Sequence, residues 1–385
     1  NINGANYFTE HMVMTFSKRG TGGAADDGED GPYYMIGAHA AGLHQHHEES
    51  LSGDSTGNGR YLVVSEFRYD SNYGDAENEV NQVGRAYLYK ASATGASDYS
   101  TPYHIFKNPN ADARYAQDSA EFNVFARDVS VSSNGNVVIG ATGVGNTDTS
   151  SGIGKVYRYL PYISYIPGST EYYYAISDSI NGNLHIPNPG FFVNFGRTVE
   201  INNKKDIFVA STETDYGRSG EGAVYVFDSN NNLSYRLANP FPNVGYGARF
   251  GLDIDINETF AAVCSRFYID SDAADTTGSG GKGRVYIYNI ATGERLKELE
   301  NPNNFGDSAG DEFGAGVMLE DDGTLLVGAI GEDVDSAGQD AGVVYRYGAA
   351  TNAVDSANFN GIVSANWFND SGVSIVIDGR YGGTR

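Results

Sequence analysis

The stretch "FGAGVMLEDDGTLLVGAIGEDVDSAGQDAGVVYRY" (313–347) decides the fold. It holds three short apolar segments, FGAGVML (313–319), LLVGAIG (325–331) and GVVYRY (342–347), separated by stretches rich in Gly, Asp and Glu. Apolar runs of this length between turn signals are typical of β-strands. A short turn, EDDG, joins the first two segments, and a longer acidic loop joins the second to the third. The stretch therefore predicts three consecutive antiparallel strands.

The same unit recurs along the chain. A Gly followed three residues later by Tyr occurs six times, in GPYYMI (31–36), GRAYLY (84–89), GKVYRY (154–159), GAVYVF (222–227), GRVYIY (283–288) and GVVYRY (342–347). A second apolar segment precedes each copy and a fourth strand follows it. In four units an earlier strand begins with Phe: FARDVSV (125–131), FGRTVEI (195–201), FGLDIDI (250–256) and FGAGVML (313–319).

Four antiparallel strands in each unit of roughly 60 residues predict an all-β fold, a single six-bladed β-propeller. The predicted blades span 7–48 plus 371–379, 49–112, 125–188, 195–240, 250–302 and 313–360. The segment SGVSIVI (371–377) is expected to join the N-terminal blade and close the ring, which would remove exposed sheet edges. Seven blades are the alternative, because the second and third units are long enough to hold an additional one.

Two repeated aromatic positions have predicted packing roles. The Phe that begins each inner strand is expected to wedge between blades. The Tyr of each Gly-x-x-Tyr segment is expected to pack inside its blade rather than contact a ligand; these residues are Tyr34, Tyr87, Tyr157, Tyr225, Tyr286 and Tyr345.

The string "FGAGV…DDGTLLVGAIGED…AGVVYRY" resembles an FG-GAP repeat, the blade unit of integrin-alpha-like β-propellers. The resemblance implies a propeller fold and an adhesion or assembly module that is extracellular or surface-exposed. Such blades often hold calcium in a loop, D-x-[DN]-x-D-G-x-x-D, between their first two strands. Here "MLEDDGTLL" places Met318 and Leu326 at two ligand positions of that loop. Asn134–Gly135 and Asp322–Gly323 are instead predicted to be two-residue hairpin turns.

Composition excludes some partners and favours others. The formal net charge of -24 argues against nucleic-acid binding and against docking on an anionic membrane, because both need basic patches. No apolar run is long enough to span a membrane. The one cysteine, Cys264, lies in the apolar segment AAVCSRF (261–267) and is predicted to be a buried strand residue.

Acidic residues gather in the loops between second and third strands, which all emerge on one face. This face is either a solvated, charged surface or a site for cations or a basic partner. Calcium is the cofactor that clustered carboxylates on Gly-rich loops would take. The candidate ligands are Asp270, Asp272, Asp275, Glu332, Asp333 and Asp335.

Two further features bear on partners. The insert LPYISYIPGSTEYYYAISD (160–178) is rich in Tyr, so it is either a packed extension of the outer strand or a contact surface. Its candidate interface residues are Tyr162, Tyr165, Tyr172, Tyr173 and Tyr174. Three Asn-x-Ser/Thr sequons, at Asn232, Asn257 and Asn369, are candidate glycosylation sites on a surface protein.

These observations predict a protein that is not an enzyme and that works outside a cell or on a particle surface. Its predicted role is adhesion, or a structural subunit of an appendage, filament or virion. Its predicted partners are other protein chains in a larger assembly, with glycans as a further candidate. The rival hypothesis is a calcium-dependent hydrolase or lyase acting on polysaccharide or lipid. The sequence shows no nucleophile elbow, phosphate loop or zinc-binding helix motif, but paired carboxylates can come from distant loops.

Overall fold

The computed structural model places strands in most of the predicted units. It describes residues 61–66, 84–90, 102–109, 124–132, 134–142, 153–163, 172–186, 193–212, 220–241, 248–266, 281–302, 310–320, 323–332, 342–348, 362–368 and 374–378. The predicted first blade (7–48) lies outside the described residues. In the described ranges, no helix is long and apolar enough to cross a membrane.

The strands form five antiparallel sheets, which we call blades 2 to 6 after the predicted units. Blade 2 contains β1 (Tyr61–Glu66), β2 (Arg85–Lys90) and β3 (His104–Lys107). Blade 3 contains β4 (Val124–Val131), β5 (Val137–Thr142), β6 (Lys155–Ile163) and β7 (Tyr172–Asn181), followed by the short 3-10 helix η3 (Gly182–Leu184). Blade 4 contains β8 (Phe195–Ile201), β9 (Ile207–Ser211), β10 (Ala223–Phe227) and β11 (Leu233–Ala238).

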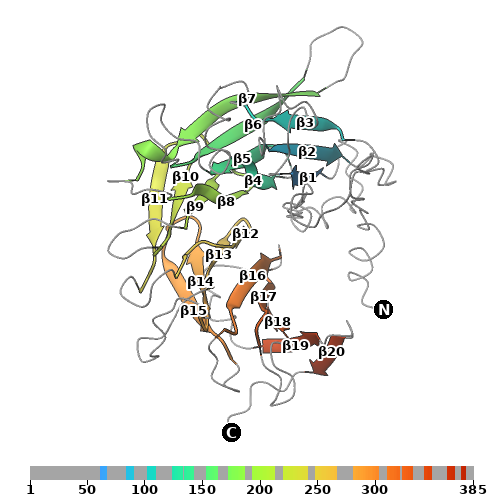
Figure 1. Ribbon diagram of the computed structural model, residues 1–385, viewed down its shortest axis with the longest axis vertical. Helices are drawn as coiled ribbons and strands as arrows, with labels where there is room; N and C mark the ends of the chain where they lie inside the picture. The colour runs from blue at the N-terminus through green and yellow to red at the C-terminus, as the bar shows by residue number, and fades with distance from the viewer. Residues whose placement is uncertain are drawn as a thin grey trace, which may run out of the picture.

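Blade 5 contains β12 (Ile254–Ile256), β13 (Phe260–Ser265), β14 (Arg284–Asn289) and β15 (Arg295–Glu300). Blade 6 contains β16 (Phe313–Leu319), β17 (Leu325–Ala329), β18 (Val343–Tyr347), β19 (Ile362–Phe368) and β20 (Ser374–Asp378). The sheets follow one another along an arc, with β4, β8, β12 and β16 on its inner side (Figure 1). The predicted all-β fold of four-stranded antiparallel units is confirmed for blades 3, 4 and 5, and the arrangement is propeller-like.

The C-terminal strand is placed differently from our expectation. β20 pairs antiparallel with β19, in a register that sets Ala365 opposite Ile377 and Trp367 opposite Ile375. It is therefore the fifth strand of blade 6. Two consecutive strands joined by a short connection pair readily with each other, and this local pairing is the one that the structure has. Ring closure by this segment is not confirmed.

The repeated Phe and Tyr residues pack together inside each blade. Ring centroids lie 5.7 Å apart for Phe125 and Tyr157 and 5.9 Å apart for Phe313 and Tyr345. The pairs Phe195–Tyr225 and Phe250–Tyr286 have almost the same spacing, 5.8 Å and 5.7 Å. All eight side chains are buried, and burial of one such ring stabilises the fold by about 2–3 kcal/mol. The predicted packing role is confirmed for Tyr157, Tyr225, Tyr286 and Tyr345, whereas Tyr87 is partly exposed and Tyr34 lies outside the described residues.

The same Phe residues connect each blade to the one before it. The main-chain N–H of Phe195, Phe250 and Phe313 donates to the carbonyl of Ile153, Glu221 and Lys282, at 2.8, 3.0 and 3.0 Å respectively. In each case the accepting residue comes directly before the Gly of the Gly-x-x-Tyr segment. A Cβ atom added at Gly154, Gly222 or Gly283 would lie 1.9, 2.3 or 1.9 Å from the carbonyl oxygen of the same Phe. The predicted wedge is thus confirmed, and it requires Gly on the neighbouring blade.

The hairpins between first and second strands are one residue longer than predicted. At Ser132–Asn136, the N–H of Gly135 donates to the carbonyl of Ser132, and the N–H of Ser132 donates to the carbonyl of Asn136. Gly135 has a φ of 75°. This is a three-residue connection with a left-handed residue before the returning strand. Glu320–Thr324 repeats it with Gly323 at a φ of 82°, so the DDG segment is part of a hairpin turn, although not a two-residue one.

We predict that Gly283→Ala destabilises the protein by about 3 kcal/mol or more, because it adds left-handed strain to a close contact with Phe313. Two glycines serve as controls. Gly310 has a φ of 103° but open space around it, so Gly310→Ala measures the strain alone. Gly316 has its nearest atom 3.9 Å away, so Gly316→Ala should cost less than about 1 kcal/mol. Denaturant unfolding compares them; equal losses for Gly283→Ala and Gly310→Ala would refute the contact.

Candidate functional site

Four acidic side chains lie on the inner strands of blades 3, 4 and 5. Asp128 comes from β4, Glu200 from β8, and Asp253 and Asp255 come from the β12 segment. We call them the inner-strand carboxyl cluster. Asp128, Glu200 and Asp255 are 5%, 8% and 3% exposed. Buried carboxylates are rare unless they are paired or hydrogen-bonded, so partners of these side chains are expected nearby.

Two of the carboxylates bind the main chain of the next blade. Asp253 Oδ2 accepts from the N–H of Val317 at 2.7 Å, and Asp255 Oδ2 accepts from the N–H of Leu319 at 2.6 Å. Both donors lie on β16. The second oxygen of Asp255 accepts from the N–H of Ile256 at 2.8 Å. Blade 5 therefore supplies acceptors for main-chain N–H groups of β16. This strand lies at the edge of its sheet, so these N–H groups have no neighbouring strand on that side.

Blades 3 and 4 have the same arrangement. Asp128 Oδ2 accepts from the N–H of Val199 at 2.8 Å, and Ser130 Oγ accepts from the N–H of Ile201 at 3.2 Å. Ser130 Oγ also donates to Glu200 Oε2 at 2.7 Å. Blade 4 reaches blade 5 through Thr198, whose hydroxyl donates to the carbonyl of Leu252 at 2.9 Å. Polar side chains at equivalent repeat positions thus connect neighbouring inner strands.

Glu200 differs electrostatically from its neighbours. Asp128 and Asp255 each accept a main-chain N–H from the next blade, whereas Glu200 accepts only from the hydroxyl of Ser130 among the hydrogen bonds described above. Burial raises the pKa of Glu200 well above its ordinary value, and the charges of Asp255 and Asp128 raise it further. Glu200 is therefore harder to ionise in the folded protein than an exposed Glu. A neutral carboxyl group can both accept from Ser130 and donate a hydrogen bond.

Sequence reasoning missed this cluster because it looked for acids in loops. The signal was present in the inner strands, where "FARDVSV", "FGRTVEI" and "FGLDIDI" carry polar residues at alternate positions. Asp128 and Asp253 occupy one position of the repeat, and Glu200 and Asp255 occupy another. Acidic residues recur at fixed positions of the strand that was predicted to be innermost in each blade. This recurrence could have identified the inner-strand carboxyl cluster.

The predicted calcium ligands fall mainly on loops that are not described. Asp270, Asp272, Asp275, Asp333 and Asp335 lie outside the described residues. Glu332 is described and buried: its Oε2 accepts from Asn301 Nδ2 at 2.9 Å, and the same amide donates to Asp311 Oδ2 at 2.8 Å. Among the described residues, no group of three or more His, Cys, Asp or Glu is arranged to hold a metal ion. Calcium binding on these loops stays a prediction.

The predicted Tyr interface is corrected at one residue. Tyr174 is 8% exposed and packs edge-on against Phe106 of blade 2, with ring centroids 5.4 Å apart. It is a packing residue between blades, because β6 and β7 extend past β5 and carry it over β3. Tyr162 pairs across the hairpin with Tyr173, and Ile163 pairs with Tyr172. The remaining candidate, Tyr165, lies outside the described residues.

The sequons have different surroundings. Asn257 is 5% exposed; its Oδ1 accepts from the N–H groups of Thr259 and Phe260, and its Nδ2 donates to the carbonyl of Glu320 at 3.1 Å. An amide held in this way disfavours a glycan on Asn257 in the folded protein. Asn232 lies in the β10–β11 hairpin, where its Nδ2 donates to Asp228 Oδ2 at 3.1 Å in an exposed contact. Asn369 lies outside the described residues.

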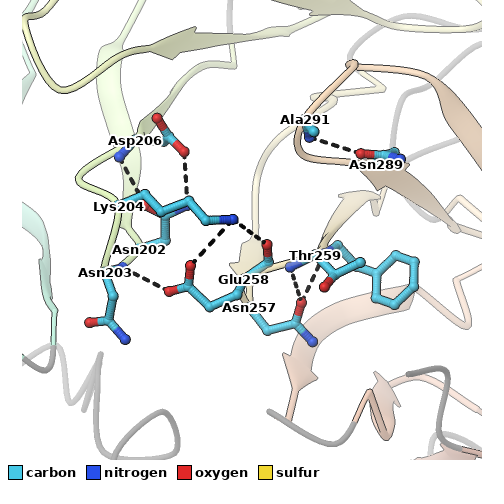
Figure 2. A network of polar contacts seen from close by, with 10 residues as sticks. Asn202, Asn203, Lys204, Asp206, Asn257, Glu258, Thr259, Asn289 and Ala291 are labelled. Atoms are coloured by element: carbon cyan, nitrogen blue, oxygen red, sulfur yellow. Dashed lines mark hydrogen bonds and ion pairs between the residues drawn. The ribbon is translucent and has the colours of Figure 1, made fainter. Parts of the chain in front are cut away.

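Asn257 belongs to a polar network that joins neighbouring hairpins (Figure 2). In blade 4, Asp206 and Asn202 close the β8–β9 turn with a 3.0 Å side-chain hydrogen bond. Glu258, in the β12–β13 turn, accepts from the N–H of Asn203 at 2.9 Å, and its carbonyl accepts from Lys204 Nζ at 3.2 Å. These contacts connect blades 4 and 5 at their turns.

Cys264 has no evident chemical role. It is fully buried, as predicted, and its Sγ accepts from the N–H of Asp253 at 3.0 Å. Burial raises the pKa of the thiol far above its ordinary value. It is therefore not a reactive nucleophile at neutral pH.

Comparison with known proteins assigns no family to this chain. No protein-family model matches the sequence, and no curated protein matches it. One similar structure is a catalytically inactive virginiamycin B lyase from Staphylococcus aureus with quinupristin (TM-score 0.31, 11% identity, covering 65% of this chain and 68% of that one). Another is Trypanosoma rangeli sialidase with the inhibitor DANA (TM-score 0.40, 11% identity, covering 84% of this chain and 53% of that one). This chain thus spans about half the length of the sialidase.

One expectation is corrected by these similarities. The sequence led us to expect a protein that is not an enzyme, yet both similar structures are enzymes by name. The expectation rested on the absence of short catalytic motifs, and propeller enzymes can assemble a site from separate blades. The exclusion of enzymatic activity is therefore withdrawn. At 11% identity, neither neighbour assigns an activity to this chain.

We predict that Asp255→Ala lowers the free energy of unfolding by about 2 kcal/mol, because it removes the acceptor of two main-chain N–H groups, Leu319 and Ile256. Asp255→Asn keeps one carbonyl oxygen and should lose roughly half as much. Denaturant unfolding gives the energies, and amide hydrogen exchange of β16 locates the effect. Unchanged exchange in β16 would contradict the assignment.

Proposed function

We propose that this protein is a six-bladed propeller serving as a binding or assembly scaffold on a cell or particle surface. In this proposal, its role is adhesion or that of a structural subunit of an appendage, filament or virion. Its partners are other protein chains. The arc in Figure 1 has blade 2 and blade 6 at its ends, and the six copies of the repeat in the sequence support six blades. Images along the ring axis by cryo-electron microscopy would count the blades.

The observation that carries this proposal is the chemistry of the outer strands. Among the described residues, four of the large hydrophobic side chains that are exposed lie on or beside the outermost strands. Tyr103 and Ile105 are 39% and 41% exposed at β3, Ile176 is 44% exposed on β7, and Leu233 is 41% exposed on β11. Single exposed apolar residues are common on protein surfaces, but their recurrence on the outer strands of blades 2, 3 and 4 supports a rim that contacts another protein.

The inner strands support the same reading. Asp253 and Asp255 accept main-chain hydrogen bonds from β16, and Asp128 accepts one from β8. These carboxylates therefore hold blades together. A rigid scaffold that presents an outer rim suits repeated protein contacts, because preorganised surfaces lose little entropy on binding.

We predict that cross-linking in material from the native source joins the rim to other chains. Lys107, which is exposed on β3, should form links to a partner chain. Lys204, in the turn between β8 and β9, serves as the comparison. Its cross-links should be mainly to residues of the same chain. Mass spectrometry of cross-linked peptides distinguishes the two. An isolated chain with only internal links, or a chain that cleaves polysaccharide or lipid when calcium is supplied, would contradict the proposal.

A further inference from the structure

The inner-strand carboxyl cluster joins three blades through groups that cannot all be ionised at low cost. Glu200 lies on β8, between Asp128 of blade 3 and the Asp253 and Asp255 pair of blade 5. Like charges buried together raise the free energy of the folded state. The cluster therefore couples the protonation of one group to the contact between blades.

The hydrogen bonds place Glu200 at the contact between neighbouring inner strands. Asp128 and Asp255 are each held as acceptors by main-chain N–H groups of the next blade, at 2.8 and 2.6 Å. Glu200 is held by the hydroxyl of Ser130, at 2.7 Å. That hydroxyl in turn accepts from the N–H of Ile201 at 3.2 Å. A change of charge at Glu200 acts directly on the contact between β4 and β8.

The charges that raise the pKa of Glu200 come from Asp255, Asp128 and Asp253. β4 carries Asp128 and also the partly exposed Arg127, β12 carries Asp255, and Asp253 comes directly before β12. The strands β5 and β9, which also pack on β8, carry no ionisable side chain. β6 contributes Lys155, whose ammonium lies 5.8 Å from the ring centre of Tyr157. β8 itself carries the partly exposed Arg197.

We propose that Glu200 makes the contact between blades 3, 4 and 5 pH-dependent: its neutral form holds the three inner strands together, and its ionisation loosens them. The pKa of Glu200 is raised in the folded state, so the folded protein binds this proton more tightly than the unfolded chain. The stabilisation is complete below the ordinary carboxyl pKa. It is lost as pH rises from there through the raised pKa, and this sign is opposite to that of a salt-bridged carboxylate. This device is independent of the proposed assembly role.

The test compares Glu200→Gln with the wild-type chain in denaturant unfolding between about pH 4 and pH 9. Gln keeps the shape and the acceptor for Ser130 and has no charge to gain. Within the window, the wild-type unfolding equilibrium constant should rise by up to about tenfold per pH unit relative to the variant. The variant should be the more stable protein at the alkaline end. Glu258→Gln, in an exposed turn, is the matched control and should follow the wild type.

Two measurements on the wild type keep the test decisive if the variant does not fold. Infrared spectroscopy should show the carbonyl stretch of a protonated carboxyl group that persists above the pH at which exposed carboxyl groups ionise, and a further rise in pH should abolish it. Amide exchange of β8, corrected for its intrinsic pH dependence, should quicken over the same range relative to β10. Identical pH dependence in wild type and Glu200→Gln, or a carbonyl stretch that disappears in the pH range where exposed carboxyl groups ionise, would overturn the proposal.

Discussion

The hydrogen bond from the N–H of an inner-strand Phe to the preceding blade sets the geometry on which the other contacts depend. It holds the Phe carbonyl against a Gly, as for Phe313 and Gly283. Residues on both sides of the Phe are left-handed, with φ of 53° at Glu312 and 86° at Gly314. The ring of Phe313 can then reach Tyr345 in its own blade. Close approach of the inner strands also lets Asp253 reach the main chain of β16.

Much of the fold could be predicted because the same residue types recur at fixed positions in each unit of the sequence. Gly and Tyr three residues apart, and Phe at the start of an inner strand, recur because a blade interface needs them at each turn of the arc. Strand pairing of the C-terminal segment could not be predicted in the same way. Its sequence, "SGVSIVI", suits a strand in any sheet, so only tertiary context decides that β20 pairs with β19.

The candidate site was harder to predict for a physical reason. Clustered acidic residues in loops predict metal ligands, whereas the sequence pattern around Asp128 and Asp255 predicts only the polar positions of an alternating strand. Their importance arises from burial between blades, which a one-dimensional pattern does not contain. The position of Tyr174 shows the same limit, since its Tyr-rich context suggested an exposed surface and the overhang of β6 and β7 carries it onto Phe106.

The Phe contact also has a direction. Blades 4 and 5 each present a Phe to the blade before and a Gly to the blade after. In blade 5 these residues are Phe250 and Gly283. An interface of this head-to-tail kind uses two different surfaces, so it can continue indefinitely or close on itself according to the rotation between units. A duplicated unit would bring both surfaces with it. Gain or loss of a whole blade would therefore preserve every contact of this interface. The number of blades is then set by the rotation between neighbouring blades, which must add up to a closed ring.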